Sequence, residues 1–280
     1  MTLRIGWFST GNGPGSRNLL NAVMDEIRAG TLDVEIPVVF CNRELGEKDG
    51  SDRFIEAVRG HGLELITYSS AAFRREHDGA LSRPGEPLPS WREAYDDEVA
   101  AKLAPYGFIY GVLAGYMLIC TEALCGRFSL LNLHPAAPGG PAGTWQEVIH
   151  QIIKTEAPSS GAMIHLATPV LDEGPPVSYC AFSLRGYPID AYWAAERAEP
   201  SPDREMIERS ALFREIRRQG AARELPLMVE TLRALAEGRV AVNGERVLDS
   251  EGHDAAPLDL SREVDRLVVP MLSNELASPE

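Results

Sequence analysis

Residues 3–27 read LRIGWFSTGNGPGSRNLLNAVMDEI, and their pattern is the clearest indication of the fold. Residues 3–9 form a short, mainly apolar run typical of a β-strand, and glycine and proline punctuate residues 11–16. Apolar residues then recur at helical spacing from Leu19 to Ile27. The order of strand, glycine loop and helix predicts the first unit of an α/β fold.

Strands and helices continue to alternate along the first 150 residues. Apolar runs bounded by turn residues predict further strands at 34–42, 63–67, 108–114 and 128–133. Helices are expected at 51–60 and from Ser90, which with Glu93 fits a capping box, to about Leu103. This alternation predicts a doubly wound, mostly parallel sheet, in which ligands bind beyond the carboxyl ends of the strands.

The second half of the chain continues the same domain, which we expect to span 1–250. Two strands are predicted at 162–167 and 177–184, with the turn LDEGPP between them. The segment at about 187–204 is interpreted as an insertion, because prolines interrupt its pattern. These prolines are Pro188, Pro200 and Pro202.

A helical stretch is expected after the insertion, over about 206–237, with Gly220 dividing it and Gly238 ending it. From 251 to 280 the chain is acidic and weakly periodic. We therefore expect the domain to end in this C-terminal helix, followed by a loosely held acidic tail.

Composition narrows the classes of partner. The 280 residues include 27 Lys and Arg against 41 Asp and Glu, which gives a formal net charge of −14. This charge disfavours nucleic acid as a partner and favours small-molecule substrates. No apolar run approaches the roughly 18 residues of a membrane span, so no membrane association is expected. The N-terminus lacks the features of a signal peptide, which predicts a cytoplasmic protein; a homodimer is left open.

Cysteine usage gives no sign of a metal site. The four cysteines form no CxxC pair and have no ligand-like spacing to histidine. We expect them to be reduced and mostly structural, and we expect no metal cofactor.

The glycine loop from Gly11 to Asn18 is the first candidate binding site. A strand-to-helix glycine turn presents backbone N–H groups at a helix N-terminus, where they can hold a phosphate without a net positive charge. The loop is neither a GxGxxG fingerprint nor a P-loop. A tight turn without a ligand is an equally good interpretation of these residues alone.

The second candidate is Asn132 with His134, in the sequence LNLHP at the end of a predicted strand. Side chains alternate along a strand, so these two point to the same side. An amide donor beside an imidazole can stabilise an oxyanion, and the imidazole can also move a proton. A capping asparagine and a hydrogen-bonded histidine before a proline turn are the ordinary alternative.

Asp172, in the turn VLDEGPP, is the third candidate. An acid in such a turn is usually only a turn residue. It gains a chemical role if it folds next to His134, where a carboxylate would favour the imidazolium form. His165, on an apolar strand, is expected to be a buried histidine with satisfied hydrogen bonds.

Together these motifs resemble the folate-dependent formyltransferases, most closely their glycinamide ribonucleotide branch. The resemblance covers about residues 3–250, in family order. Its most specific part is Asn-x-His-Pro followed by Leu-Asp-x-Gly, with the aspartate 38 residues after the histidine. The matching stretches are RIGWFSTGNGPGSRNLL, SWREAYDDEV, GVLAGYMLIC, LLNLHPA, GAMIHLATPVLDEGPPV and ELPLMVETLRALAEGRV.

The resemblance implies a Rossmann-like formyltransferase fold and a transfer reaction. Asn132, His134 and Asp172 would move a formyl group from the co-substrate 10-formyltetrahydrofolate to an amine. The residues implied at the acceptor's phosphate are Gly13, Gly15, Ser16, Arg17, Asn18 and Arg92. Those implied along the folate are Leu113, Met117, Leu118, Cys120, Ala167, Val170 and Leu171.

Three positions depart from the family pattern. The glycine loop is three residues longer than usual, and Leu118 stands where bacterial relatives have a basic residue. Ala221 stands where the family often has a glutamate that meets the amine end of the acceptor. Glu224, one helical turn further on, is the replacement we expect.

Other functions remain open on sequence grounds. A hydrolase could use the same triad with water as acceptor; relatives of that kind usually carry an additional N-terminal domain, and this chain starts on its first strand. A sugar-amine formyltransferase fits the glycine loop less well, and the charge disfavours initiator tRNA. From another class, a phosphate-binding module remains open, whereas a nicotinamide oxidoreductase lacks GxGxxG and an acid at the end of the second strand.

Overall fold

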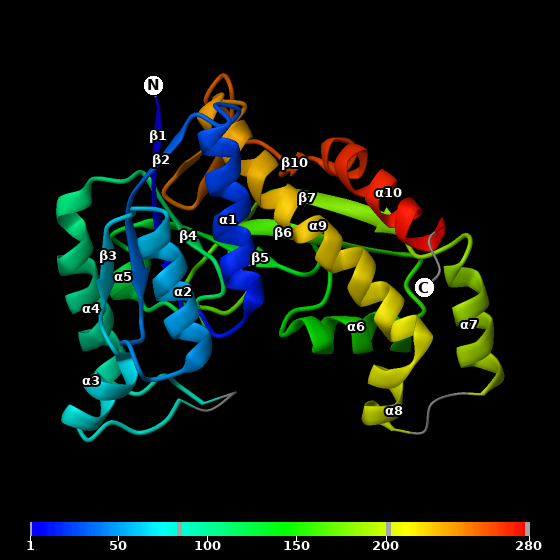
Figure 1. The fold of residues 1–280 in the computed structure, drawn as a ribbon, viewed down its shortest axis with the longest axis horizontal. Coiled ribbons are helices and arrows are strands. Elements are labelled where there is room, and N and C mark those ends of the chain that lie inside the picture. The colour runs from blue at the N-terminus through cyan, green and yellow to red at the C-terminus, as the bar shows by residue number, and fades with distance from the viewer. Residues whose placement is uncertain (1, 83–85, 200–202, 278–280) are drawn as a thin grey trace.

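The computed structural model describes residues 2–82, 86–199 and 203–277, and its centre is an eight-stranded sheet (Figure 1). The strand order is β10-β7-β6-β5-β4-β1-β2-β3. All pairs are parallel except β5 with β6 and β6 with β7. The strands are β1 (Leu3–Ser9), β2 (Val34–Cys41), β3 (Leu65–Thr67), β4 (Tyr110–Leu113), β5 (Ser129–His134), β6 (Ser159–Leu166), β7 (Pro176–Ser183) and β10 (Leu258–Asp259). The mostly parallel, doubly wound sheet predicted from the sequence is confirmed.

Helices cover both faces of this sheet. On β1, Ile5 and Trp7 face one hydrophobic core and Phe8 faces the other, as the alternation of a strand buried on both sides requires. The first core packs against α1 (Pro14–Arg28), α2 (Asp49–Gly60), α9 (Ala211–Ala236) and α10 (Ser261–Ala277). The second packs against α3 (Ser70–Glu76), α4 (Trp91–Leu103) and α5 (Glu122–Cys125).

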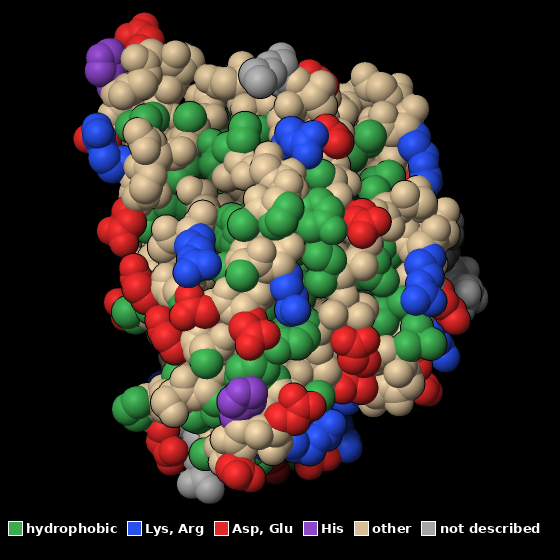
Figure 2. All heavy atoms as spheres, turned by 90° about the vertical axis from the view of Figure 1, so that its left-hand side faces the viewer, with side chains coloured by type: hydrophobic (Ala, Val, Ile, Leu, Met, Phe, Trp, Pro, Cys, Tyr) green, Lys and Arg blue, Asp and Glu red, His purple; other side chains and the backbone are tan. Residues whose placement is uncertain are grey.

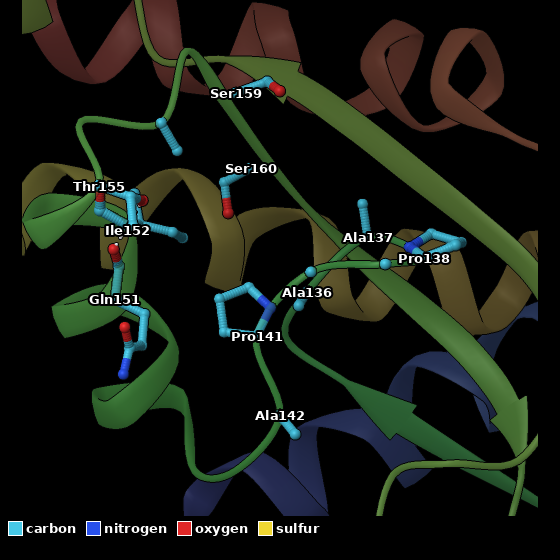
Figure 3. A pocket seen from close by; sticks show the side chains of 13 residues that line it. Ala136, Ala137, Pro138, Pro141, Ala142, Gln151, Ile152, Thr155, Ser159 and Ser160 are labelled. Atoms are coloured by element: carbon cyan, nitrogen blue, oxygen red, sulfur yellow. Dashed lines mark hydrogen bonds between the residues drawn. The ribbon is translucent and has the colours of Figure 1, made fainter.

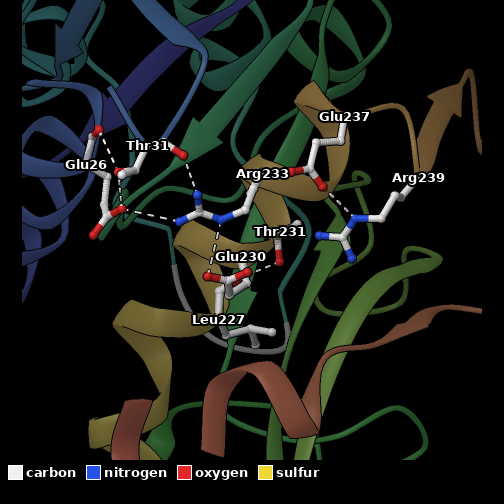
Figure 4. Close-up of polar contacts among 8 residues, drawn as sticks. All are labelled: Glu26, Thr31, Leu227, Glu230, Thr231, Arg233, Glu237 and Arg239. Carbon is white, nitrogen blue, oxygen red and sulfur yellow. Dashed lines mark hydrogen bonds and ion pairs between the residues drawn. The ribbon is translucent and has the colours of Figure 1, made fainter. Parts of the chain in front are cut away.

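The long helix α9 runs unbroken through Gly220, so the predicted division there is wrong. Its apolar side chains are buried on both sides of this glycine, and this packing outweighs the roughly 1 kcal/mol that glycine costs in a helix. The break lies instead at Ser210, which caps α9 after the short helix α8 (Arg204–Arg209). Near its other end, Arg233 bonds to Glu26 and to the Thr31 carbonyl, and so ties α9 to the end of α1 (Figure 4).

The predicted loosely held tail is also wrong for residues 258–277. Strand β10 pairs with β7, and α10 buries Val264, Val268 and Leu272 in the first core. These side chains recur every four residues and form a narrow apolar stripe, which is hard to recognise in the sequence because exposed apolar residues such as Leu267 and Met271 lie between them. A small hairpin, β8 (Val240–Asn243) and β9 (Arg246–Asp249), precedes it and was not predicted. Residues 278–280 lie outside the described part of the chain.

The structure corrects two predictions: the irregular insertion at 187–204 and the capping box at Ser90. The segment 187–204 contains α7 (Ile189–Ala198), which begins after Pro188 and buries Ile189 and Trp193; Pro200 and Pro202 lie outside the described residues. Ser90 makes no capping bond, so the expected capping box is absent there. A capping box forms instead between Thr144 and Glu147, where α6 (Trp145–Lys154) begins.

The surface mixes charges of both signs. Figure 2 shows the face that lies on the left of Figure 1, where acidic and basic side chains are interspersed with apolar ones. Among the described residues, no helix is both long and apolar enough to cross a bilayer.

Candidate active site

The end of β5 carries the first two candidate residues. Asn132 pairs with Leu113 of β4 on one side and with His165 of β6 on the other, so it lies in the middle of the sheet. His134 is the last residue of the strand, and its side chain is only 3% exposed. Both lie at the carboxyl end of parallel β4 and β5, where sheets of this kind form their sites.

Asp172 reaches the same place from the loop between β6 and β7. Its Oδ2 lies 3.6 Å from Nδ1 of His134 and accepts a hydrogen bond of 3.1 Å from the Gly143 N–H. Its backbone is left-handed, with φ of 57°, which aspartate tolerates better than most residues. The structure therefore brings together three side chains that the sequence spreads over 41 positions.

His165 joins this group, although the sequence suggested only a buried structural histidine. Its Nδ1 lies 2.8 Å from the Leu166 carbonyl, which can only accept, so Nδ1 carries the proton. In the neutral ring Nε2 is then an acceptor, and it lies 3.1 Å from Nδ2 of Asn132. Nε2 also lies 3.7 Å from Oδ1 of Asp172. His165 thus orients the Asn132 amide and leaves its second N–H free to donate.

The one sequence signal for His165 was its position. It stands at the carboxyl end of an apolar strand, just before the turn that carries Asp172. The antiparallel pairing of β6 with β5, which places it directly opposite Asn132, could not be deduced from that pattern.

Burial lowers the pKa of His165 below its usual 6.5, against the smaller opposing effects of the Leu166 carbonyl and Asp172. In the unfolded chain the ring binds a proton below about pH 6.5, whereas the folded chain resists it. The contribution of His165 to stability is therefore complete above pH 6.5 and is lost as the pH falls below it. Chemical denaturation at several pH values should show a smaller acid loss of unfolding free energy in His165→Gln than in the wild type. Parallel profiles of unfolding free energy against pH for the two proteins would contradict a lowered pKa of His165.

The loop after β5 holds the other side of the His134 ring. Nε2 of His134 lies 2.9 Å from the Pro141 carbonyl, so Nε2 is the protonated nitrogen in the neutral ring. Pro141 also forms a wall of a cavity of about 670 Å³, which lies between this loop, α6 and the start of β6 (Figure 3). Its polar side chains are Gln151, Thr155, Ser159 and Ser160, and none of its lining residues is charged.

The predicted folate residues lie on two segments, 113–120 and 167–171. Met117, Val170 and Leu171 expose 54–65% of their surface, which is unusual for large apolar side chains and suits a ligand with an aromatic face. Ala167 borders a second cavity, of about 330 Å³, lined also by Cys125, Leu130 and Leu166. Leu113 and Cys120 are buried in the second core, and Leu118 is half-buried against it. They therefore support this surface from below.

The glycine loop leaves the N-terminus of α1 without a side-chain cap. Gly13 is the N-cap of α1 and makes no side-chain capping bond, and Pro14 follows as the first helical residue. A β-carbon added at Gly13 or Gly15 would meet no atom within 4 Å. Arg17 is half-buried, Asn18 is exposed and Ser16 is buried.

Arg92 and Glu224 are already engaged. The Arg92 side chain is 1% exposed and donates to the Ile119 carbonyl at 2.6 Å, which places it behind the predicted folate surface. No bond from Arg92 to the glycine loop is present among the described residues. Glu224 is bound to Arg217, and the two share a narrow crevice with Pro135, next to His134. A phosphate at Arg92 or an amine at Glu224 would have to replace these contacts.

Within the ranges 2–82, 86–199 and 203–277, no group of three or more His, Cys, Asp or Glu side chains is arranged to hold a metal ion.

This geometry agrees with the similarity of the chain to known proteins. The model of the Formyl transferase family matches residues 10–183. Phosphoribosylglycinamide formyltransferase of Escherichia coli K12 is 26% identical over 164 residues, which are 58% of this chain and 66%, just under two thirds, of that protein.

Two solved structures share the fold. Glycinamide ribonucleotide transformylase 1 of Symbiobacterium toebii superposes with a TM-score of 0.60 at 25% identity, over 88% of this chain and 93% of that one. A formyltetrahydrofolate deformylase of Pseudomonas syringae pv. tomato gives 0.59 at 19% identity, over 89% of this chain and 66% of that one. Because the family model matches more than half of it, the chain belongs to the formyl transferase family, close to the phosphoribosylglycinamide formyltransferases.

Proposed function

We propose that this protein transfers the formyl group of 10-formyltetrahydrofolate to the amine of a phosphorylated substrate, with glycinamide ribonucleotide as the expected acceptor. The observation that carries the proposal is the convergence of Asn132, His134 and Asp172, with 3.6 Å between the His134 ring and the Asp172 carboxylate. The family match and the relatives named above support the same chemistry.

Asn132 and His134 supply the electrostatic part of the mechanism. As the amine adds to the formyl carbon, the carbonyl oxygen becomes negative, and the free N–H of Asn132 and the protonated His134 ring stabilise it. Asp172 stabilises the imidazolium and accepts the proton that the amine loses. That proton then passes to the folate nitrogen, whose bond to the formyl carbon breaks.

The donor is expected to lie along the surface of Met117, Val170 and Leu171. The cavity of about 330 Å³ beside Ala167 is within the usual size range of a ligand pocket, and its lining combines apolar side chains such as Leu130 and Leu166 with polar and charged ones such as Arg127. In this account the fused ring of the folate enters that cavity, and the formyl group lies toward Asn132.

The glycine loop is expected to bind the acceptor's phosphate, because its free N–H groups meet an anion at a helix N-terminus. Gly13→Ala and Gly15→Ala should raise KM for glycinamide ribonucleotide about tenfold, since a methyl group would stand where the phosphate approaches the backbone. The same substitutions should not lower the melting temperature, because each methyl group enters open space.

Steady-state kinetics and thermal unfolding check this prediction. Gly60→Ala is the matched control, since Gly60 also has open space around its β-carbon but lies at the end of α2. Unchanged KM in both loop variants would remove the phosphate from this loop.

Hydrolysis of 10-formyltetrahydrofolate is the second candidate, favoured by the similarity of the fold to a deformylase. A product assay separates the two. With the formyl donor fixed, glycinamide ribonucleotide, its dephosphorylated form, other amines and water alone are compared as acceptors. We expect the phosphorylated amine to be used fastest. Equal formate release with and without an amine would favour the hydrolase instead.

A further inference from the structure

Thr10 links the two segments that the proposed function assigns to different substrates. It follows β1 directly and precedes Gly11, where the glycine loop begins. The side chain is almost completely buried, with 1% of the residue exposed. A hydroxyl in such a place needs a hydrogen-bond partner, and its partner is on another segment of the chain.

The hydrogen bonds of Thr10 extend the pairing of β1 with β4 past the ends of both strands. The Ala114 N–H donates to the Phe8 carbonyl at 2.8 Å, and the Thr10 N–H donates to the Gly115 carbonyl at 3.1 Å. At the next step the Met117 N–H donates to Thr10 Oγ1 at 2.9 Å. A side-chain hydroxyl thus takes the place of a backbone carbonyl where the ladder ends.

Neighbouring contacts make this junction rigid. Ser51 of α2 donates to the Thr10 carbonyl at 2.8 Å, and Ser9 donates to the Ala114 carbonyl at 2.7 Å. Gly115 has φ of 69°, and a β-carbon there would lie 2.3 Å from Oγ of Ser16. The glycine loop and the segment 114–117 therefore pack so closely that only glycine fits at 115.

Met117 is the residue that this junction fixes. Its side chain is 65% exposed on the predicted folate surface, yet its backbone N–H is held by Thr10. We propose that Thr10 is a positioning residue for the formyl donor: its hydroxyl fixes the backbone of Met117, and so sets the folate surface from the end of β1. This inference rests on the proposed function.

The test compares Thr10→Val, which removes the hydroxyl, with Thr10→Ser, which keeps it. Loss of one buried hydrogen bond predicts a rise in KM for 10-formyltetrahydrofolate of about tenfold in Thr10→Val, with a smaller change in kcat. Thr10→Ser should stay near the wild-type KM. A merely structural role would not produce this split between KM and kcat, and retention of KM in Thr10→Ser would assign the effect to the hydroxyl.

Thr231→Val is the matched control. Thr231 is also fully buried, and its hydroxyl also makes hydrogen bonds, to the Leu227 carbonyl and to Ser178 (Figure 4 shows the first). Thr231 lies on α9, in the core. The Thr231→Val variant should therefore lower stability with no change in KM for the donor. An equal rise in KM in Thr231→Val, or an unchanged KM in Thr10→Val, would overturn the inference.

Amide hydrogen exchange of the peptide that contains Met117 gives a readout independent of turnover. The wild-type Met117 amide should exchange slowly despite its exposed side chain, and Thr10→Val should speed this exchange. Fast exchange in the wild type contradicts the inference even if Thr10→Val does not fold. Absence of turnover in the wild type would contradict the proposed function alone. Turnover in the wild type together with unchanged kinetics in Thr10→Val would contradict only the proposed role of Thr10.

Discussion

Asn132→Ala, His134→Ala and Asp172→Asn should each lower turnover at least about 100-fold. Removal of one oxyanion donor typically costs about 10²–10³ in rate, and in the proposed mechanism Asp172 stabilises the His134 imidazolium and accepts the proton of the amine. Asp172→Asn is the cleanest variant, because its amide oxygen can still accept from the Gly143 N–H that now binds the carboxylate. Its melting temperature should therefore change little. Steady-state turnover with 10-formyltetrahydrofolate and glycinamide ribonucleotide measures the effect.

His150→Ala is the control for these variants. His150 is also a largely buried histidine, but its ring is paired with Glu208 of α8 rather than with a residue of the triad. It should retain turnover within a few-fold of the wild type. Near-normal turnover in any one of the three triad variants would remove that residue from the mechanism.

Gly174→Ala should be the second most damaging single change, although Gly174 carries no functional group. A β-carbon at this position would lie 1.7 Å from the Leu166 carbonyl oxygen, which is backbone and cannot move aside as a side chain can. The loop must therefore shift, and Asp172 lies two residues away. We expect about 1–3 kcal/mol of lost stability, typical of an overpacked site, together with at least a 100-fold loss of turnover.

Glu173→Ala separates this steric effect from a general sensitivity of the loop. Glu173 is exposed, and its truncation should leave both the unfolding free energy and turnover nearly unchanged. Denaturant unfolding and steady-state kinetics on the two variants give both quantities. If Gly174→Ala kept wild-type turnover, the position of Asp172 would not depend on this loop geometry.

The sequence predicted every strand of the sheet except the two-residue β10, because each of the others is a short apolar run with turn residues on both sides. β1 has the predicted bounds, and β5 and β7 each differ from them by one residue at either end. Strands buried on both faces of a sheet give this strong signal, since apolar residues predominate in them. The hairpin β8–β9 was overlooked although Asn243-Gly244, a common hairpin turn, marks it.

Predictions from helix propensity and short sequence windows were wrong where packing against the rest of the fold determines the secondary structure. Gly220 is a helix breaker by propensity, yet α9 continues through it because the residues on both sides are buried. The sequence of α10 looked like an acidic tail because no strong helical pattern marks it. Three buried side chains stabilise the helix through contacts that only the folded sheet provides. Neither outcome can be deduced from a short window of sequence.

In the candidate site, too, the sequence predicted what one strand determines and not what contacts between distant segments determine. Asn132 and His134 share one strand, so alternation alone predicted that they lie together. The approach of Asp172 depended on the family resemblance, and the antiparallel pairing of β6 with β5, which no sequence pattern indicated, placed His165 opposite Asn132. Arg92 was expected at the phosphate and lies instead behind the predicted folate surface, because a motif gives a position on a helix but not the direction of a long side chain.

In the proposed reaction, a formyl group passes from a folate to an amine at this site. The most direct test uses 10-formyltetrahydrofolate labelled at the formyl carbon, with wild-type protein and glycinamide ribonucleotide, and follows the label. We predict that the label appears in the amide of the acceptor, at a rate that Asp172→Asn abolishes. Label found only in formate, or left on the folate, would contradict the account.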